Sequence, residues 1–222
     1  MSLCHLSLGE KIGQLFMVGF EGTAVTPGLA AWMATYGWGG VIIFGRNVES
    51  PAQLLALTQA LQYGAAARRL LPLLIAVDQE GGRVTRLKAP FTAFPSAAKV
   101  GATGSEPLAF AVGQALANEL HAVGINMNMA PVLDVLTNAA NTVIGDRAFG
   151  TDPSRVAALG TALMRGMHAA GVLAVGKHFP GHGDTQLDSH VALPVSARTM
   201  AELRACELLP FQKAMAAGLE AI

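Results

Sequence analysis

The sequence predicts a parallel α/β fold, and within that class a (β/α)8 barrel. Three observations support this prediction: short apolar runs rich in β-branched residues, longer segments of helical character between them, and polar clusters directly after the runs. Runs that are apolar throughout are typical of strands covered on both faces. Regular alternation of strand and helix along a chain indicates a parallel sheet with helical crossovers.

Six segments are expected to form strands, and they correspond to about the first six of the eight β/α units of a barrel. Each is bounded by glycine, proline or polar residues, as strand ends usually are. The segments are LFMVGF (15–20), GVIIF (40–44), LLIAVD (73–78), INMNMAPVLDV (125–135), VLAVGKHF (172–179) and a last strand that begins at LEAI (219–222).

The intervening helices have recognisable first turns, in which a Ser or Thr oxygen accepts hydrogen bonds from unpaired amides. The pairs with this spacing are Ser7 with Glu10, Ser50 with Pro51 and Gln53, and Thr199 with Glu202. The segment from 199 to 218 is expected to be one helix. Three helices are predicted to end at Gly124, Gly171 and Gly218, because glycine readily adopts the left-handed conformation that terminates a helix.

The alternative to a barrel is a doubly wound sheet, and the polar clusters favour the barrel. Each cluster follows a predicted strand, and the carboxyl ends of barrel strands converge on one mouth. The clusters are Arg46 with Asn47, Asp78 with Glu80, Asp134 with Arg147, and the residues from Lys177 onward. No G-x-G-x-x-G motif opens a helix after a strand, so a nucleotide-binding sheet has less support.

Composition indicates one domain over residues 1–222, with 52% hydrophobic and 14% charged residues and no net charge. No basic stripe favours nucleic acid, and no apolar run approaches the ~20 residues that cross a bilayer. Cys4 and Cys206 match no metal or redox spacing. The N-terminal stretch lacks the pattern of a signal peptide, so the cytoplasm is the expected location.

The segment DQEGGRVTR (78–86) is the first candidate for chemistry. In an extended backbone, Asp78 and Glu80 share a face, and the two glycines that follow allow close approach of a ligand. A buried carboxylate here could orient sugar hydroxyls, because it accepts hydrogen bonds in fixed directions. The alternative is that Glu80 forms a structural ion pair with Arg83 or Arg86.

A second candidate is Arg147, which lies between two turn glycines in GDRAFG (145–150). Its guanidinium could offer two parallel hydrogen bonds to a carboxylate or an acyl oxygen, or it could anchor its own loop.

The segment KHFPGHGDTQLDSH (177–190) concentrates groups that bind or transfer protons. Lys177 and His178 finish the predicted strand. Asp188 and His190 stand two residues apart, so an extended backbone would put both on one side. This geometry suits a dyad in which the carboxylate orients the imidazole, and the histidine then serves as a general acid and base.

Two other interpretations of this segment remain open. A divalent metal could be held by imidazole and carboxylate ligands, and the candidates are His178, His182, Asp184 and His190. Alternatively, the loop could be a purely structural set of mutual hydrogen bonds. The spacing of His178 and His182 does not present both on one helix turn, because Pro180 and Gly181 lie between them.

In this order and with these separations, the motifs DQEGGRVTR, GDRAFG and KHFPGHGDTQLDSH resemble the family 3 glycoside hydrolases. The resemblance is to the β-N-acetylglucosaminidase branch that acts in bacterial peptidoglycan recycling, and it covers essentially the whole chain. It implies a (β/α)8 barrel that hydrolyses a terminal β-linked N-acetylglucosamine with retention of configuration. It implies no metal and no organic cofactor; nucleic acid and membrane are excluded as expected partners by the composition described above.

The resemblance also assigns roles to residues. His190 would be the acid/base and Asp188 its partner. Residues 181–189 would form a mobile loop with glycine hinges. The residues that would hold the sugar are Asp78, Arg86, Arg147, Lys177 and His178, and those of the mobile loop include Gly181, His182, Gly183 and Asp184.

The sequence departs from the family in one respect: no S-D-D-like motif, which carries the nucleophilic aspartate in this branch, follows His190. We therefore expect the nucleophile and the last two barrel units to lie beyond residue 222. The chain alone is expected to bind the sugar weakly, to turn it over poorly, and to oligomerise through unpaired strand edges. A metal-dependent hydrolase and a non-catalytic sugar-binding remnant are the alternative functions.

Overall fold

The computed structural model of the chain describes residues 5–67, 71–185 and 195–222. A parallel five-stranded sheet lies at its centre, with the strands in the order β1-β2-β3-β6-β7. The pairing is in register along the sheet; for example, Val41 of β2 lies opposite Ile75 of β3. The strands are β1 (Met17–Val18), β2 (Gly40–Ile43), β3 (Leu74–Val77), β6 (Met127–Asn128) and β7 (Leu173–Ala174).

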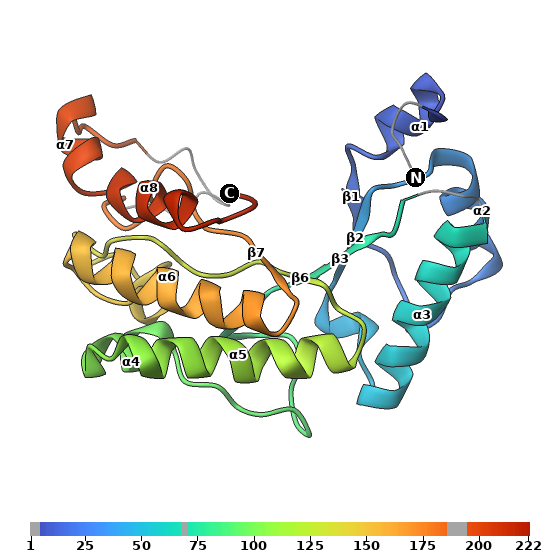
Figure 1. Cartoon of the computed structure of the whole chain (residues 1–222), viewed down its shortest axis with the longest axis horizontal. Helices are drawn as coiled ribbons and strands as arrows, with labels where there is room; N and C mark the ends of the chain where they lie inside the picture. The colour runs from blue at the N-terminus through green and yellow to red at the C-terminus, as the bar shows by residue number, and fades with distance from the viewer. Residues whose placement is uncertain (1–4, 68–70, 186–194) are drawn as a thin grey trace.

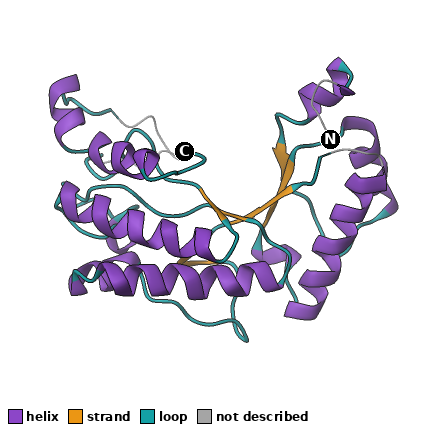
Figure 2. Ribbon diagram, viewed as in Figure 1, coloured by secondary structure: helices purple, strands orange, loops and turns teal. Residues whose placement is uncertain are grey.

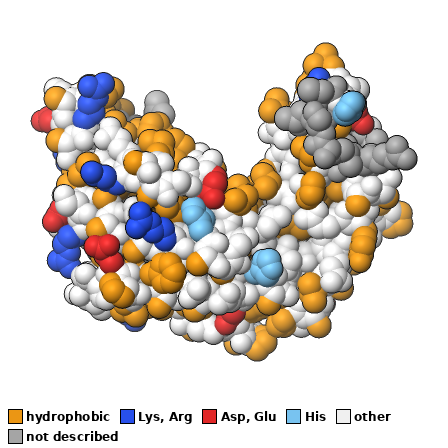
Figure 3. Space-filling view, in the orientation of Figure 1, with side chains coloured by type: hydrophobic (Ala, Val, Ile, Leu, Met, Phe, Trp, Pro, Cys, Tyr) orange, Lys and Arg blue, Asp and Glu red, His pale blue; other side chains and the backbone are white. Residues whose placement is uncertain are grey.

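Helices surround this sheet (Figures 1 and 2). At one end of it lie α2 and α3, and at the other α5, α6 and α8. The space-filling view shows a deep hollow between the arm that carries α1 and the arm that carries α7 and α8 (Figure 3). The helices are α1 (Leu8–Gly13), α2 (Pro27–Tyr36), α3 (Pro51–Ala67), α4 (Ala97–Thr103), α5 (Glu106–Ala122), α6 (Pro153–Ala169), α7 (Met200–Ala205) and α8 (Leu208–Ala216).

The predicted helix boundaries are confirmed at both kinds of terminus. Ser7 and Thr199 each form a full capping box with the glutamate three residues later. The Ser50 hydroxyl accepts from the amide of Gln53 at 3.1 Å. At the other ends, the three predicted glycines, at 124, 171 and 218, follow α5, α6 and α8 with φ angles of 76°, 77° and 102°. No described helix combines the length and hydropathy that crossing a membrane requires.

The predicted strand over 125–135 is regular only at its start, where β6 pairs with β3 and β7. Pro131 has no N–H to donate, so beyond Asn128 the ladder becomes irregular. Pro131 still accepts from the Lys177 amide at 3.1 Å, and an isolated bridge joins Val132 to Lys177. The last expected strand is present as a bridge between Val175 and Ala221, parallel to the sheet.

The single helix expected over 199–218 is wrong, because the chain forms α7 and α8 with a break at Cys206. The physical cause is Pro210. Its ring would clash with the carbonyl of Cys206 in a continuous helix, and it cannot supply the hydrogen bond to that carbonyl. The break places the side chain of Glu207 in the interior, where it is 1% exposed.

Close packing between α5 and α6 fixes the helical layer on one side of the sheet. Gly113 of α5 lies against the carbonyl of Leu163, and Gly166 of α6 lies against the carbonyl of Phe110. Each glycine therefore allows backbone to approach backbone, which a Cβ atom would prevent. This contact fixes the position of α6. The segments that precede and follow α6 carry polar residues of the site, among them Arg147 and Lys177.

We expect Gly113→Ala to destabilise the chain by about 1 to 3 kcal/mol, because the added methyl overpacks a backbone contact. The matched control is Gly9→Ala in α1, where nothing lies within 4 Å of the added Cβ. That change is expected to leave stability unchanged or raise it by up to about 1 kcal/mol, since alanine favours helix over glycine. Urea unfolding of the two variants measures the difference, and equal effects would contradict the packing argument.

Candidate active site

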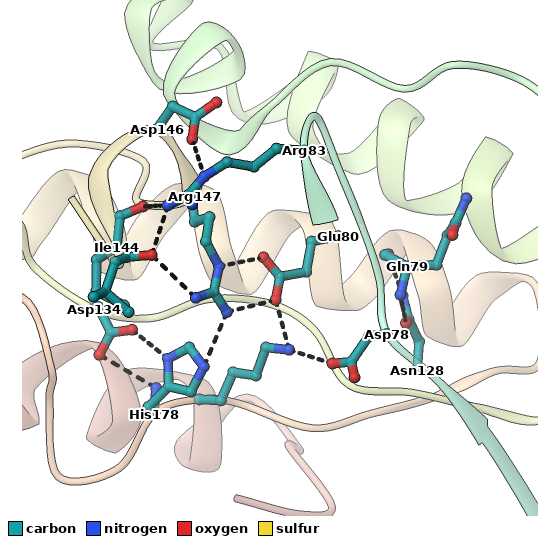
Figure 4. Close-up of polar contacts among 12 residues, drawn as sticks. Asp78, Gln79, Glu80, Arg83, Asn128, Asp134, Ile144, Asp146, Arg147 and His178 are labelled. Carbon is teal, nitrogen blue, oxygen red and sulfur yellow. Dashed lines mark hydrogen bonds and ion pairs between the residues drawn. The ribbon is translucent and has the colours of Figure 1, made fainter. Parts of the chain in front are cut away.

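Polar side chains from three strand ends converge on one cluster at the mouth (Figure 4). Asp78 directly follows β3, and Glu80 belongs to β4 (Gln79–Gly81), which forms a two-stranded hairpin with β5 (Val84–Thr85). Arg147 ends the short 3-10 helix η3 (Gly145–Arg147). The convergence of Asp78, Glu80 and Arg147 confirms that distant polar clusters meet in space. The predicted cluster of Arg46 with Asn47 is not among them, because both side chains donate to the Phe20 carbonyl instead. The hairpin itself was not foreseen.

Lys177 connects the two carboxylates that follow β3. Its Nζ lies 2.7 Å from Asp78 Oδ1 and 2.6 Å from Glu80 Oε1. Asp78 and Glu80 therefore share a face, as the extended segment predicted. Gln79 lies on the opposite face, where the residue is 2% exposed and its side-chain Nε2 donates to the Leu87 carbonyl at 3.2 Å. Successive side chains of this extended segment point to opposite faces, so Asp78 and Glu80 enter the site while Gln79 enters the core.

Arg147 forms a two-pronged ion pair with Glu80. Its Nε and Nη2 donate to the two carboxylate oxygens at 2.9 and 2.8 Å. Its Nη1 donates to the Val143 carbonyl at 3.2 Å, so the guanidinium also anchors its own loop. Both interpretations offered for Arg147 therefore apply. Burial acts to raise the pKa of Glu80, but Arg147 and Lys177 outweigh it and hold the pKa below its usual value.

The proposed pairing of Glu80 with Arg83 or Arg86 is wrong. Arg83 instead lies 2.8 Å from Asp146 and donates to carbonyls of the loop before η3. The sequence could not discriminate among these arginines, because the partner of Glu80 is 67 residues away along the chain. Arg86 lies at the margin of the cluster, with its Nη2 3.8 Å from Asp78 Oδ2 and its side chain 33% exposed.

His178 lies between Asp134 and Arg147. Its Nδ1 is 2.6 Å from Asp134 Oδ2, and its Nε2 is 3.0 Å from Arg147 Nη2. An arginine nitrogen can only donate, so Nε2 must accept and the ring proton must be on Nδ1, facing the carboxylate. The donor and acceptor pattern therefore makes His178 neutral in this arrangement.

Asp134 is the site residue that sequence reasoning missed. It was noted as a polar residue at a strand end, but no role was given to it. Its side chain is 0% exposed and accepts from the amides of His178 and His182, at 3.2 and 2.7 Å, besides the His178 ring. The signal that could have found it is an aspartate inside an apolar segment, since a buried carboxylate requires partners.

Residues 181–185 are fastened to the segment that follows β6. The Asp184 carboxylate accepts from Thr137 at 2.9 Å and from Arg198 at 3.0 Å. The chain approaches this segment closely at Gly183, where a Cβ would overlap the Val135 carbonyl. Gly181, with φ of 127°, packs against the side chain of Glu207. In this structure the two glycines permit close packing, and their role as hinges stays a prediction.

The metal-binding alternative has no support in the described part of the chain. The rings of His178 and His182 are directed to Asp134 and Thr185, with nitrogen-to-oxygen distances of 2.6 Å in both cases. Asp184 is engaged by Arg198. No group of three or more His, Cys, Asp or Glu side chains among the described residues is placed to hold a metal ion.

Asp188 and His190, the predicted acid/base dyad, lie outside the described residues, so their roles stay predictions. The predicted sugar-binding residues are all described, and the structure brings them together. Three of them are partly exposed although most of each side chain is buried: Lys177 is 14% exposed, Asp78 21% and His178 34%. Such groups can offer fixed hydrogen-bond donors and acceptors to the hydroxyl and carbonyl groups of a small polar ligand.

Comparison with known proteins agrees with this geometry. Residues 7–222 match the family model described as "Glycosyl hydrolase family 3 N terminal domain". A β-hexosaminidase of Pseudomonas aeruginosa is 48% identical over 186 residues, which is 83% of this chain and 54% of that protein. A β-hexosaminidase of Thioalkalivibrio sulfidiphilus is 46% identical over 213 residues, which is 93% of this chain and 59% of that protein. The chain thus spans little more than half the length of these curated relatives.

Solved structures show the same fold. A family 3 β-N-acetylglucosaminidase from Paenibacillus superimposes with a TM-score of 0.95 at 45% identity, covering 97% of this chain and 41% of that one. NagZ from Neisseria gonorrhoeae, in complex with N-trifluoroacetyl-D-glucosamine, gives 0.86 at 37% identity, covering 92% and 61%. The predicted barrel fold and the predicted resemblance are therefore confirmed, and the chain belongs to glycosyl hydrolase family 3.

Proposed function

We propose that this chain forms the sugar-binding part of a glycosidase that removes terminal β-linked N-acetylglucosamine with retention of configuration. The observation that carries the proposal is one continuous network at the mouth, in which Asp78, Lys177, Glu80, Arg147, His178 and Asp134 each contact the next. The names of the relatives, β-hexosaminidase and β-N-acetylglucosaminidase, support the same activity.

The network suggests how the sugar would be held. Asp78 can accept from two neighbouring hydroxyls, while Lys177 can donate to one of them. Arg147 and His178 lie at the other side of the cluster (Figure 4), and the His178 side chain is 34% exposed. Arg86, which is less buried, can reach a group at the outer end of the ligand. These five residues come from three separate strand ends, which gives the site a fixed shape.

His190, with Asp188 as its partner, is proposed as the acid/base. Retaining glycosidases usually use a second carboxyl group for this purpose. A histidine has a different advantage beside an anionic nucleophile: its neutral form avoids like-charge repulsion, and its protonated form can donate to the leaving oxygen.

The described carboxylates at the mouth are poor candidates for the nucleophile. Glu80 is held by Arg147 and Lys177, and Asp134 is fully buried against His178. Asp78 is paired with Lys177. A carboxylate that is already neutralised by a close cation is a weak nucleophile, and none of the three faces the mouth unpaired. We therefore propose that the nucleophile is another carboxylate, outside the described cluster.

Peptidoglycan fragments are the natural substrates that we propose, and cytoplasmic recycling the process. This part of the proposal rests on the KHFPGHGDTQLDSH segment, which resembles that branch of the family. The N-acetylglucosamine derivative in the Neisseria NagZ structure is in keeping with an amino sugar as the recognised group.

The proposal is tested by assaying the full gene product on an aryl N-acetyl-β-glucosaminide and on the matching aryl β-glucoside. We expect hydrolysis of the first to exceed that of the second, because the acetamido group is part of what is recognised. Proton NMR of the first-formed sugar should show the β-anomer. Absence of hydrolysis, or initial release of the α-anomer, would show that the proposed activity or its stereochemistry is wrong.

Arg147→Lys is expected to lower kcat/KM on the order of 10²-fold. Lysine cannot make the two-pronged contact with Glu80, so the sugar would be held in a less favourable position for reaction. The matched control is Arg83→Lys. Arg83 also pairs with an aspartate and with loop carbonyls nearby, but it has no contact with Glu80. Steady-state kinetics on the same aryl substrate measure both variants, and a similar loss in both would indicate a general loop effect.

Glu80→Gln tests whether the ionised carboxylate organises the site. Because the pKa of Glu80 is lowered in the folded chain, its charge stabilises the fold above the unfolded value of 4.5. This contribution is lost as the pH falls through the folded pKa. We expect the variant to be less stable by roughly 3 kcal/mol at pH 7, and the difference to shrink below pH 4.5. Urea unfolding at several pH values measures it; a difference that does not vary with pH would contradict the argument.

A further inference from the structure

Arg198 occupies a position that the sugar-binding network does not explain. It lies near the start of α7 and contacts two carboxylates that belong to different parts of the chain. Its Nη2 donates to Asp184 Oδ1 at 3.0 Å, and its Nε lies 3.0 Å from Glu207 Oε1. In sequence, Asp184 and Arg198 stand on either side of the segment 186–194, which carries Asp188 and His190.

The near side of this segment is firmly attached to the barrel. The backbone N–H of Asn138 donates to the Gly183 carbonyl at 3.2 Å, and Asn141 Nδ2 donates to the His182 carbonyl at 2.7 Å. The Thr185 hydroxyl contacts the His182 ring at 2.6 Å. Asp184 therefore presents its carboxylate to Arg198 from a fixed position.

The far side of the segment is attached through Glu207. This glutamate is 1% exposed, and its carboxylate oxygens have no hydrogen-bond partner among the described residues. Its Cβ and Cγ pack under Gly181, where an added Cβ would lie 2.7 Å from Glu207 Cβ. Arg198 brings a positive charge to within 3.0 Å of this buried group, at an angle that gives an ion pair without a hydrogen bond.

The two contacts need an arginine. A buried carboxylate without a nearby cation is costly, so Glu207 favours Arg198 where it lies. The planar guanidinium carries five N–H groups, so Nη2 can donate to Asp184 while Nε lies against Glu207. A lysine has one compact ammonium group, which could not contact the carboxylates of Asp184 and Glu207 in the same way. The hydrogen bond from Arg198 also lowers the pKa of Asp184, so the pair is ionised at neutral pH.

We propose that Arg198 is a positioning residue: by tying Asp184 to Glu207 it sets the separation of the two ends of the segment that carries Asp188 and His190. This inference rests on the proposed function, because it assigns a catalytic consequence through His190. The side-chain partners of Arg198 among the described residues are Asp184 and Glu207, neither of which belongs to the sugar-binding cluster. Its effect is on the placement of the general acid.

The test uses the full gene product with Arg198→Lys, and with Asp184→Asn as a second, milder variant. Two aryl N-acetyl-β-glucosaminides are compared, one with a 2,4-dinitrophenyl leaving group and one with a 4-methylphenyl group. The first departs with little protonation, whereas the second depends on the general acid. A misplaced acid therefore lowers kcat/KM selectively for the second substrate.

We expect Arg198→Lys to lower kcat/KM at least about tenfold for the 4-methylphenyl substrate and less than about twofold for the dinitrophenyl substrate. His190→Ala should give the same pattern more strongly. The control is Arg155→Lys in α6, whose Nη2 donates to the Gly101 carbonyl at 3.0 Å and which has no carboxylate partner among the described residues. It should leave both values unchanged. Equal losses on the two substrates, or no loss, would overturn the proposal.

A second measurement does not depend on activity. Amide hydrogen exchange in the peptides that cover 181–185 and 195–199 should accelerate in Arg198→Lys, while exchange in α5 and α6 stays as in the parent protein. If the parent protein hydrolyses neither substrate, the proposed function is wrong. The exchange data would still show whether Arg198 links Asp184 to Glu207. Unchanged exchange at both ends of the segment would show that Arg198 does not hold them together.

Discussion

The Glu80 carboxylate is the group on which the rest of the mouth depends. It accepts two hydrogen bonds from Arg147 and lies 2.6 Å from Lys177, so one side chain after β3 joins the end of β7 and the loop that contains η3. Without it, Arg147 would lose the carboxylate that it pairs with, and Lys177 would keep only Asp78 as a partner, although both cations are largely buried. Arg147, once fixed, fixes in turn the accepting nitrogen of His178. Glu80 therefore fixes the position of Arg147, and Arg147 fixes that of His178.

Local patterns in the sequence predicted the elements well, since the information for a strand or a helix end lies within a few residues. The capping pairs at Ser7 and Thr199 and the terminal glycines are examples, and they formed as predicted. The break between α7 and α8 was also within reach, because Pro210 is incompatible with a continuous helix through Cys206. The residues on either side of the break do form helices, so only the continuity of the segment was predicted wrongly.

The sequence predicted which residues would gather in the site, but not which of them would pair with one another. The argument that strand ends converge placed Asp78, Arg147 and Lys177 in one cluster, and it did not say which would touch. Three arginines were candidates for pairing with Glu80. The one that bonds it, Arg147, lies far along the chain and is brought close by the packing of whole β/α units. Asp134 was overlooked for the same reason, because its importance comes from burial, which depends on the assembled barrel.

The charge balance of the cluster bears on the kind of ligand it suits. Three cationic groups, on Arg86, Arg147 and Lys177, face three carboxylates, on Asp78, Glu80 and Asp134, and the donor pattern keeps His178 neutral. A site that has already neutralised its own charges has no excess field for a phosphate or a free carboxylate. It offers instead many fixed donors and acceptors, which is what an uncharged, hydroxyl-rich ring with an amide requires. The same internal pairing occupies these carboxylates, and for this reason the proposed function assigns binding and nucleophilic attack to different residues.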